Sequence, residues 1–234
     1  GRVPYPFCGT APPKPGRLKP IMTMKKLLLL TAAVAAMHFT AGAQPLEWGV
    51  HAGLNLACER ASATGGAVAA NSQPQFQAGF TLSTRVARAV PLYFRTGLDF
   101  TGRGGESDGA TDNLYYLQLP LTLSCRIDCG RMVSIRPEVG FYYALGLFAN
   151  AKEEGVVLEY EGRRFDYFNT KVEGRKALKR SDLGLRFGVD AVLKRHYGIG
   201  IGYDQGLLNI NKNLYESDVK LRNGVFYIRL SYDL

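Results

Sequence analysis

Hydrophobic and polar residues alternate along most of the chain, and the clearest case is the stretch 181–205. In its first arm every second residue is apolar, namely Leu183, Leu185, Phe187, Val189, Ala191 and Leu193. After a break at 194–196, tyrosine and isoleucine alternate with glycine over 197–203. This period of two residues is typical of a β-strand rather than a helix. The stretch therefore predicts a hairpin whose arms, at roughly ten residues each, are long enough to cross a membrane.

The same alternation predicts six further strands. They lie at about 48–56, 75–83, 92–100, 117–124, 133–147 and 226–234. Long connections follow the first, third, fifth and seventh strands, at 58–73, 101–113, 149–180 and 208–218, whereas short breaks follow the others. Bacterial outer-membrane barrels combine short turns at one end with long loops at the other. The order predicts an all-β fold, an eight-stranded antiparallel up-and-down transmembrane β-barrel. Within 149–180, the segments 156–160 and 163–168 are expected to extend the flanking strands into a hairpin.

Alternation alone does not tell which face of the barrel points outward, because a soluble barrel would bury the apolar face. Three features favour the membrane form. The polar face carries charges of both signs that can pair across a lumen, namely Arg95, Arg136, Arg186 and Arg229 with Asp99, Glu138, Asp190, Asp204 and Asp233. The same face is rich in glycine, which suits a crowded interior. Finally, Trp48, Tyr197 and Tyr232 fall at the short-turn end, where an interfacial aromatic girdle is expected.

The N-terminal region has the composition of segments that do not belong to the folded domain. Residues 24–43 combine Lys25-Lys26, an apolar run and Ala41-Gly42-Ala43, which is the pattern of a cleaved signal peptide. Residues 1–23 are rich in proline and basic residues, and we expect them to be a disordered, non-native upstream segment. The barrel domain is then 44–234.

This division changes the meaning of the charge. The chain has 29 Lys+Arg against 20 Asp+Glu, but six of the basic residues and no acidic residue precede Gln44. The remaining 23 basic and 20 acidic residues give the mature domain a net charge of only +3. The basic character of the full chain therefore does not indicate nucleic-acid binding.

Few residues are candidates for chemistry. Cys125 and Cys129 flank a turn and could pair in an oxidising compartment, which their spacing does not decide. A zinc site would need more ligands, and no histidine is near. The two histidines after Gln44 are His51, expected in the lumen, and His196, expected in a short turn. The chain has no Gly-x-Ser-x-Gly, phosphate-binding-loop or His-Glu-x-x-His motif. We predict no enzymatic activity, no catalytic residue, no metal and no cofactor.

The long connection 149–180 ends in a basic cluster at 175–180, which is Arg175, Lys176, Lys179 and Arg180 with Ala177 and Leu178 between them. One interpretation is a solvated loop end. The other is a site for anionic lipid headgroups or polysaccharide.

Five short motifs, in order along the chain, carry a family resemblance. They are 48–55 (WGVHAGLN), 76–80 (FQAGF), 116–121 (YLQLPL), 136–140 (RPEVG) and 203–210 (YDQGLLNI). With them the region 44–234 resembles the PorT-like group of outer-membrane β-barrel proteins of Bacteroidota. The resemblance implies an eight-stranded barrel and little about function. The chain departs from the family at its end, where Leu234 replaces the more usual aromatic residue.

These observations predict a protein of the outer membrane, exported by its signal peptide and inserted by the barrel-insertion machinery. We expect a monomer surrounded by outer-membrane lipid, with a lumen plugged by charged side chains and a structural, adhesive or binding role for its long loops. The alternatives are a soluble periplasmic ligand-binding barrel of the lipocalin type, an accessory subunit of a secretion or gliding machine and, less favoured, a membrane-embedded hydrolase.

Overall fold

The computed structural model describes residues 46–234 with short gaps at 64–65, 70, 87–88, 108–109, 154–155, 158, 161–162, 165, 169–170, 173–174, 177 and 213–218. The predicted upstream segment 1–23 and signal peptide 24–43 lie outside the described residues. In the described part, no helix is long and apolar enough to cross a membrane.

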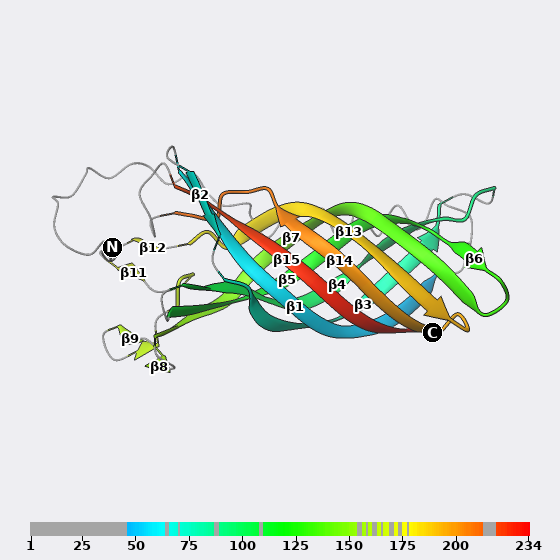
Figure 1. The fold of residues 1–234 in the computed structure, drawn as a ribbon, viewed down its shortest axis with the longest axis horizontal. Helices are drawn as coiled ribbons and strands as arrows, with labels where there is room; N and C mark the ends of the chain where they lie inside the picture. The colour runs from blue at the N-terminus through cyan, green and yellow to red at the C-terminus, as the bar shows by residue number, and fades with distance from the viewer. Residues whose placement is uncertain are drawn as a thin grey trace. The chain divides into compact units, whose positions relative to one another are not determined.

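Eight long antiparallel strands close into a barrel, as predicted (Figure 1). They are β1 (Glu47–Ala63), β3 (Gln73–Arg85), β4 (Leu92–Ser107), β5 (Ala110–Cys125), β7 (Val133–Glu153), β13 (Ser181–Leu193), β14 (Tyr197–Gly206) and β15 (Lys220–Asp233). Each of these strands pairs with its neighbour in the chain order, β1 also pairs with β15, and the pairing of β7 with β13 spans the longest connection. Closure leaves none of the eight strands with an unpaired edge.

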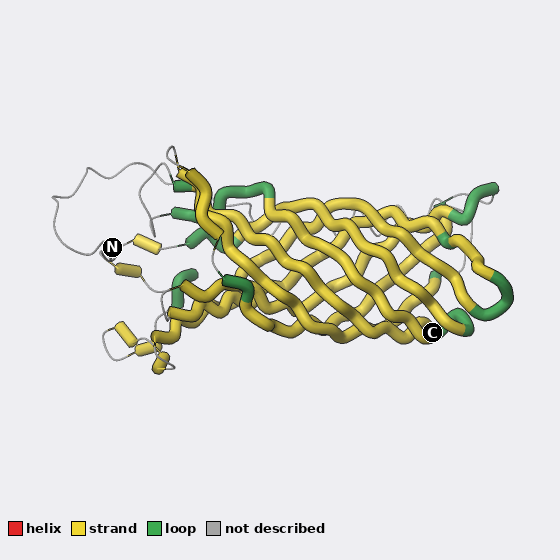
Figure 2. The backbone as a smooth tube through the Cα atoms, viewed as in Figure 1, coloured by secondary structure: helices red, strands yellow, loops and turns green. Residues whose placement is uncertain are grey.

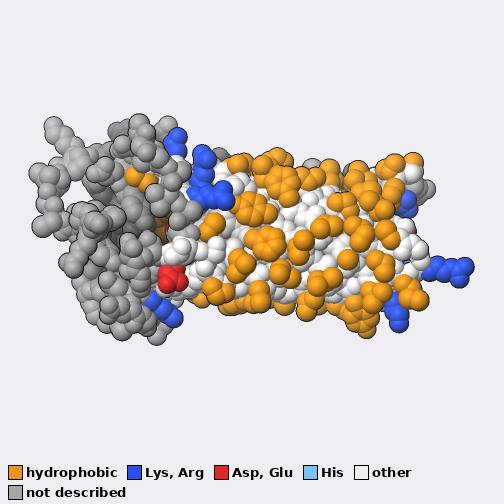
Figure 3. Space-filling view, viewed as in Figure 1, with side chains coloured by type: hydrophobic (Ala, Val, Ile, Leu, Met, Phe, Trp, Pro, Cys, Tyr) orange, Lys and Arg blue, Asp and Glu red, His pale blue; other side chains and the backbone are white. Residues whose placement is uncertain are grey.

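The apolar face of the strands points outward and the polar face lines the lumen. Leu54 is 66% exposed and Leu230 is 64% exposed, whereas Asp190 and Arg229 are 2% and 4% exposed. Figure 3 shows hydrophobic side chains covering the visible side of the barrel. This arrangement is the reverse of a lipocalin-type barrel, which buries its apolar face, so the soluble alternative is wrong.

The strands extend further toward the long-connection end, here called the loop end, than the alternation predicts (Figure 2). The predicted open loop 101–113 is instead the end of a hairpin, in which Gly102 pairs with Tyr115 and Ser107 with Ala110. The glycines in this stretch look like a loop in the sequence, but they serve close packing. Gly104 has φ +137°, and a Cβ there would collide with the carbonyl oxygen of Asp112.

Several short strands lie at the loop end, beyond the eight long strands. They are β2 (Gly66–Ala69), which pairs with β1, and β8 (Val156–Val157), which pairs with β7. Two further small pairs are β9 (Glu159–Tyr160) with β10 (Arg163–Arg164) and β11 (Lys171–Val172) with β12 (Arg175–Lys176). The hairpin predicted within 149–180 is thus only partly present: 159–160 and 163–164 pair with each other, but in a two-stranded sheet of their own, and β13 is not extended because it begins at Ser181.

The opposite, turn end carries the short connections and one more short strand, β6 (Ile127–Cys129), paired with β7. Here Leu234 donates a backbone hydrogen bond of 2.8 Å to the carbonyl of Trp48, so the first and last strands meet. The rings of Tyr197 and Tyr232 lie 5.3 Å apart and edge-on, and both are exposed together with Trp48. The predicted aromatic girdle is therefore present.

Candidate functional site

The centre of the lumen holds a square of four charges. Arg95 from β4 contacts Glu138 from β7 at 2.9 Å and Asp190 from β13 at 2.8 Å. Arg229 from β15 contacts the same two carboxylates at 2.7 and 2.8 Å. All four residues occupy inward positions of the alternating pattern, which explains why they meet. The square has no net charge, and each charge has two partners of opposite sign.

A second layer lies next to this square. The Arg186 guanidinium makes two hydrogen bonds of 2.8 Å to Asp204 and contacts Asp99 at 3.0 Å. Asp99 also lies 3.3 Å from Nε2 of His51. The predicted pairing of Arg95, Arg186 and Arg229 with lumen carboxylates is thus confirmed, while Arg136 pairs with Asp233 at 2.5 Å nearer the turn end.

A third layer of buried charges lies toward the loop end, and the sequence analysis does not predict it. Arg103 contacts Asp182 at 2.6 Å and is hydrogen-bonded to Gln118. Asp182 also accepts hydrogen bonds from the Tyr142 hydroxyl at 3.2 Å and from Asn223 at 3.0 Å. Arg103 lies in the glycine-rich stretch that predicts a loop. Only its charge, at a position that continues the inward-facing alternation of the strand, could have indicated that it lies in the lumen. It is the largest fully buried side chain of the described residues.

Aromatic rings fill the spaces between these ions. The Arg103 guanidinium lies 4.6 Å from the ring centroid of Tyr142, and that of Arg186 lies 5.1 Å from the ring of Tyr227. One cavity in the lumen, beside His51 and Arg186, measures about 10 Å³. A volume of this size holds at most about one water molecule. Among the described residues, ion pairs and aromatic rings thus occupy the lumen around this cavity.

An apolar cap closes the lumen at the loop end. It consists of Leu114, Tyr116, Tyr142, Ala144, Ala149, Phe168, Leu178, Ile210 and Leu221, all buried. Phe168 comes from the long connection between β7 and β13, and its ring packs edge-on against Tyr116 with centroids 5.5 Å apart. A Cβ at Gly146 would lie 2.6 Å from the Phe168 ring, so glycine makes room for it. The long connection thus folds back onto the barrel.

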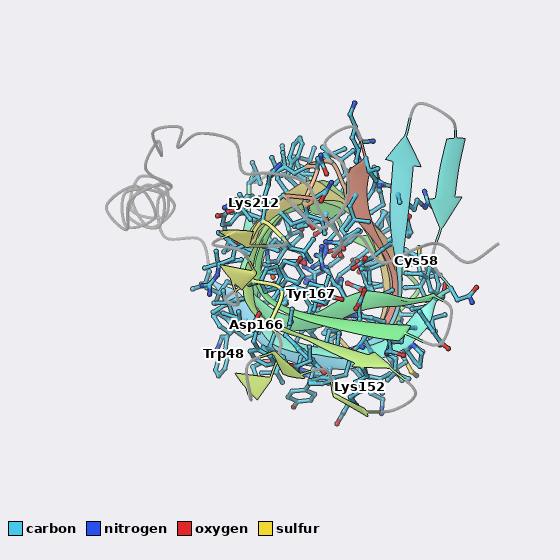
Figure 4. The ribbon with its side chains drawn as sticks, turned by 90° about the vertical axis from the view of Figure 1, so that its left-hand side faces the viewer. Trp48, Cys58, Lys152, Asp166, Tyr167 and Lys212 are labelled. Carbon is cyan, nitrogen blue, oxygen red and sulfur yellow. The ribbon has the colours of Figure 1, made fainter. Side chains whose placement is uncertain are left out.

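Polar contacts hold the cap in place. Asp166 accepts hydrogen bonds from the backbone N–H groups of Ala149 at 3.1 Å and Phe168 at 2.9 Å. The Tyr167 hydroxyl donates a hydrogen bond of 2.7 Å to Asp112 on β5. Figure 4 views the barrel from this end and places Asp166 and Tyr167 within the outline of the strands. These contacts tie the centre of the long connection to β5 and β7.

Glu59 is a buried carboxyl at the mouth, three residues beyond Leu56, the last large exposed apolar residue of β1. Burial, with a smaller contribution from Asp112, raises the pKa of Glu59 from 4.5 to about 8. Because the folded state holds this proton more tightly than the unfolded state, stability falls as the pH rises from about 4.5 to about 8.

We expect the Glu59→Gln variant to lack this loss of stability at rising pH, because glutamine has no proton to lose. Its stability advantage over the wild type should grow between pH 5 and pH 8, by at most about 1.4 kcal/mol per pH unit. The measurement is denaturant unfolding in detergent at several pH values. Glu106→Gln is the control, because Glu106 is an exposed carboxylate on a neighbouring part of the mouth. Identical pH dependence in Glu59→Gln and the wild type would contradict the prediction.

The two histidines lie where the sequence predicts. His196 is exposed in the turn after β13, and His51 is buried in the lumen, with Nδ1 3.3 Å from the Thr81 hydroxyl and Nε2 facing Asp99. A hydroxyl, an imidazole and a carboxylate in this order resemble a nucleophilic triad. The water-sized cavity beside them, however, gives a substrate no room. We interpret the three groups as part of the lumen network.

The structure also locates the cysteines and the basic cluster that the sequence analysis considered. Cys58, Cys125 and Cys129 are free thiols, so the structure does not pair Cys125 with Cys129. Of the basic cluster 175–180, Ala177 and the side chains of Arg175 and Lys176 lie outside the described part. Lys179 is exposed and its ammonium group donates to the carbonyl of Asn209 at 2.9 Å. Among described residues, no group of three or more His, Cys, Asp or Glu side chains is arranged to hold a metal.

Several solved structures are similar in fold. Neisserial surface protein A is 17% identical with a TM-score of 0.47, covering 81% of this chain and 99% of that chain. Ail, the attachment invasion locus protein of Yersinia pestis, is 16% identical with a TM-score of 0.41, covering 80% and 98%. OprG from Pseudomonas aeruginosa is 13% identical with a TM-score of 0.40, covering 82% and 98%.

A search of curated protein sequences finds no match to the chain. The sequence profile described as "Outer membrane protein beta-barrel domain" matches residues 42–212, which is most of the chain. The match covers β1 to β14, including the strands that supply most of the lumen charges. This protein therefore belongs to the outer membrane protein beta-barrel domain family.

Proposed function

We propose that this protein is a sealed, non-enzymatic outer-membrane barrel that works through the surface of its loop end. The observation that carries the proposal is the filled lumen, in which three layers of ion pairs lie beneath the apolar cap. An eight-stranded barrel has an interior just wide enough for side chains. Here those side chains pair with one another and leave about 10 Å³ beside His51 and Arg186.

Opening such a lumen would require several buried ion pairs to separate together. Breaking one buried pair costs about 3–5 kcal/mol when the partner stays behind uncompensated. Asp182 alone is bound by Arg103, Tyr142 and Asn223, so its movement would disturb three strands at once. The cost of opening supports a structural or binding role rather than diffusion of solutes.

The rest of the proposal concerns cellular context. The pattern of 24–43 supports export by a cleaved signal peptide, and the five motifs support membership of the PorT-like group. The loop end would then face the cell exterior. Lys179 of the basic cluster 175–180 is exposed beside the buried cap residue Leu178, and this exposure supports a role of the cluster in binding an anionic polysaccharide or lipid headgroup. We propose a monomer, inserted by the barrel-insertion machinery.

Conductance across a planar lipid bilayer tests the sealed lumen. We expect the wild-type protein to insert without producing stable current steps, because no continuous water-filled path crosses the three layers. An open porin in the same membrane provides the positive control. Protection from protease and a gel band that changes mobility on boiling establish that the barrel has inserted and folded. Stable, reproducible single-channel steps from the inserted protein would overturn the proposal.

A further inference from the structure

Three cationic side chains lie together on the outward face of the barrel at the loop end. Arg60 on β1 pairs directly with Arg222 on β15, and Ser62, the next outward residue of β1, pairs with Lys220. All three cationic residues are exposed. We call them the rim cations. Figure 3 shows Lys and Arg side chains where the hydrophobic surface ends on this side of the barrel.

Like charges directly opposite each other on neighbouring strands repel and destabilise the pairing. Among the described residues, no carboxylate forms a salt bridge with the rim cations, whereas every lumen arginine has at least one acidic partner. The pairing of Arg60 with Arg222 therefore carries a repulsion that an anion bound between the two side chains would relieve.

The position of the rim cations relative to the apolar surface of the barrel indicates which anion could bind them. Leu56 and Phe226 are the last large exposed apolar residues on β1 and β15, and each lies four positions from its arginine. Four residues correspond to roughly 13 Å along a strand, or about 10 Å in height at the usual tilt of barrel strands. Long basic side chains bend back toward the membrane surface by several ångströms. The guanidinium groups therefore reach the level of the lipid headgroups.

The surface between the arginines and the apolar belt is also suited to a headgroup. Cys58 and Gly224 are register partners there, between the arginines and the apolar belt. A Cβ at Gly224 would lie 2.8 Å from the Tyr203 hydroxyl, so the glycine lets this hydroxyl lie over the β15 backbone beneath the rim cations. Tyr203 on β14 thus places a polar group at the upper edge of the apolar belt, as interfacial tyrosines do.

We propose that Arg60, Lys220 and Arg222 form a binding site for the phosphate group of an outer-leaflet lipid. Two guanidinium groups and one ammonium group supply the donors that a phosphate monoester accepts most strongly. The acyl chains of the same lipid would cover the apolar belt below, on Leu56 and Phe226. The inference rests on the proposed membrane location but not on the sealed lumen.

Binding of phosphatidic acid to the full chain in neutral detergent tests the site, with affinity measured by native mass spectrometry. We expect phosphatidic acid to bind and diacylglycerol with the same acyl chains not to bind. The variant R60Q/K220Q/R222Q should bind phosphatidic acid roughly 100-fold more weakly, since each basic residue near the surface strengthens the attraction of anionic lipid about fivefold. The variant R131Q/K152Q/K212Q loses the same charge at exposed positions elsewhere and should bind as the wild type does.

Each of these binding measurements has a result that would contradict the proposed phosphate site. Unchanged affinity in R60Q/K220Q/R222Q, an equal loss in the control variant, or equal binding of diacylglycerol would do so. Displacement of the lipid by an equal concentration of inorganic phosphate would show that free phosphate, not lipid, is recognised. The boiling-dependent gel shift checks that both variants fold. Conducting channels with intact phosphatidic acid binding would overturn the sealed lumen alone, so the two proposals fail separately.

Discussion

Replacing both acidic corners of the lumen square, in the variant E138Q/D190N, is expected to lower the free energy of unfolding by about 3–5 kcal/mol or to prevent folding. Arg95 and Arg229 each contact both of these carboxylates. In the variant both guanidinium groups stay buried at the centre of the barrel with no counter-charge from the square. The protein has one tryptophan, Trp48, on the outer surface, so its fluorescence reports denaturant unfolding in lipid vesicles.

A matched variant separates lost charge pairing from lost volume. R95Q/E138Q/D190N/R229Q removes all four charges and keeps side chains of similar size. Replacing a complete buried ion network by neutral groups is often nearly neutral for stability. We therefore expect this variant to recover much of the stability that E138Q/D190N loses. If the two variants were equally unstable, specific packing of the square rather than its charge would be the dominant contribution.

Introducing a charge at the middle of the outer surface is expected to be almost as damaging. Ile228 on β15 is 45% exposed and lies midway between Phe226 and Leu230 on the outward face. In the hydrocarbon region, Ile228→Arg should destabilise the barrel by about 2–4 kcal/mol. The measurement is again denaturant unfolding in vesicles. In water, the same substitution at a half-exposed surface position would change stability little.

The control for this prediction is Tyr232→Arg, four residues further along the same face. Tyr232 belongs to the aromatic girdle at the turn end, where an arginine costs only about 0–1 kcal/mol because it reaches the headgroups. A clear difference between the two variants would place the hydrocarbon core at Ile228. Equal effects at both positions would contradict a membrane surface for this face of β15.

The fold was predictable because each membrane strand alternates two chemically different faces over many residues. Leu183 to Leu193 and Tyr197 to Tyr203 need no knowledge of their neighbours to indicate strands. The choice of outward face also followed from the sequence, since charges such as Arg95 and Asp190 are tolerable in a membrane barrel only when they point inward and pair. Both conclusions depend on local pattern, which a single sequence records.

The mouth of the barrel was not predictable in the same way. Arg60 and Arg103 lie in stretches rich in glycine or alanine, which predict loops although the strands continue through them. Phe168 ends a segment of the charged connection that the sequence predicts as a strand extension, and its partners Tyr116 and Gly146 are distant in sequence. Its position depends on how the long connection folds back, and that is decided by contacts that no local pattern contains. The cap and the rim cations therefore appear only in the structure.

β7 is the longest strand and extends well beyond the barrel at the loop end. At 21 residues it is about twice as long as the roughly ten that a membrane crossing needs. Its partner β5 continues beside it as far as Ala110, opposite Glu153. Beyond Phe148, the last large exposed apolar residue of β7, the paired extension is a ribbon roughly 15 Å long that carries β8 away from the apolar belt. In the proposed orientation, with the loop end outside the cell, an antibody could bind this ribbon without touching the lipid, so substitutions selected by antibodies would fall on the ribbon rather than on the barrel.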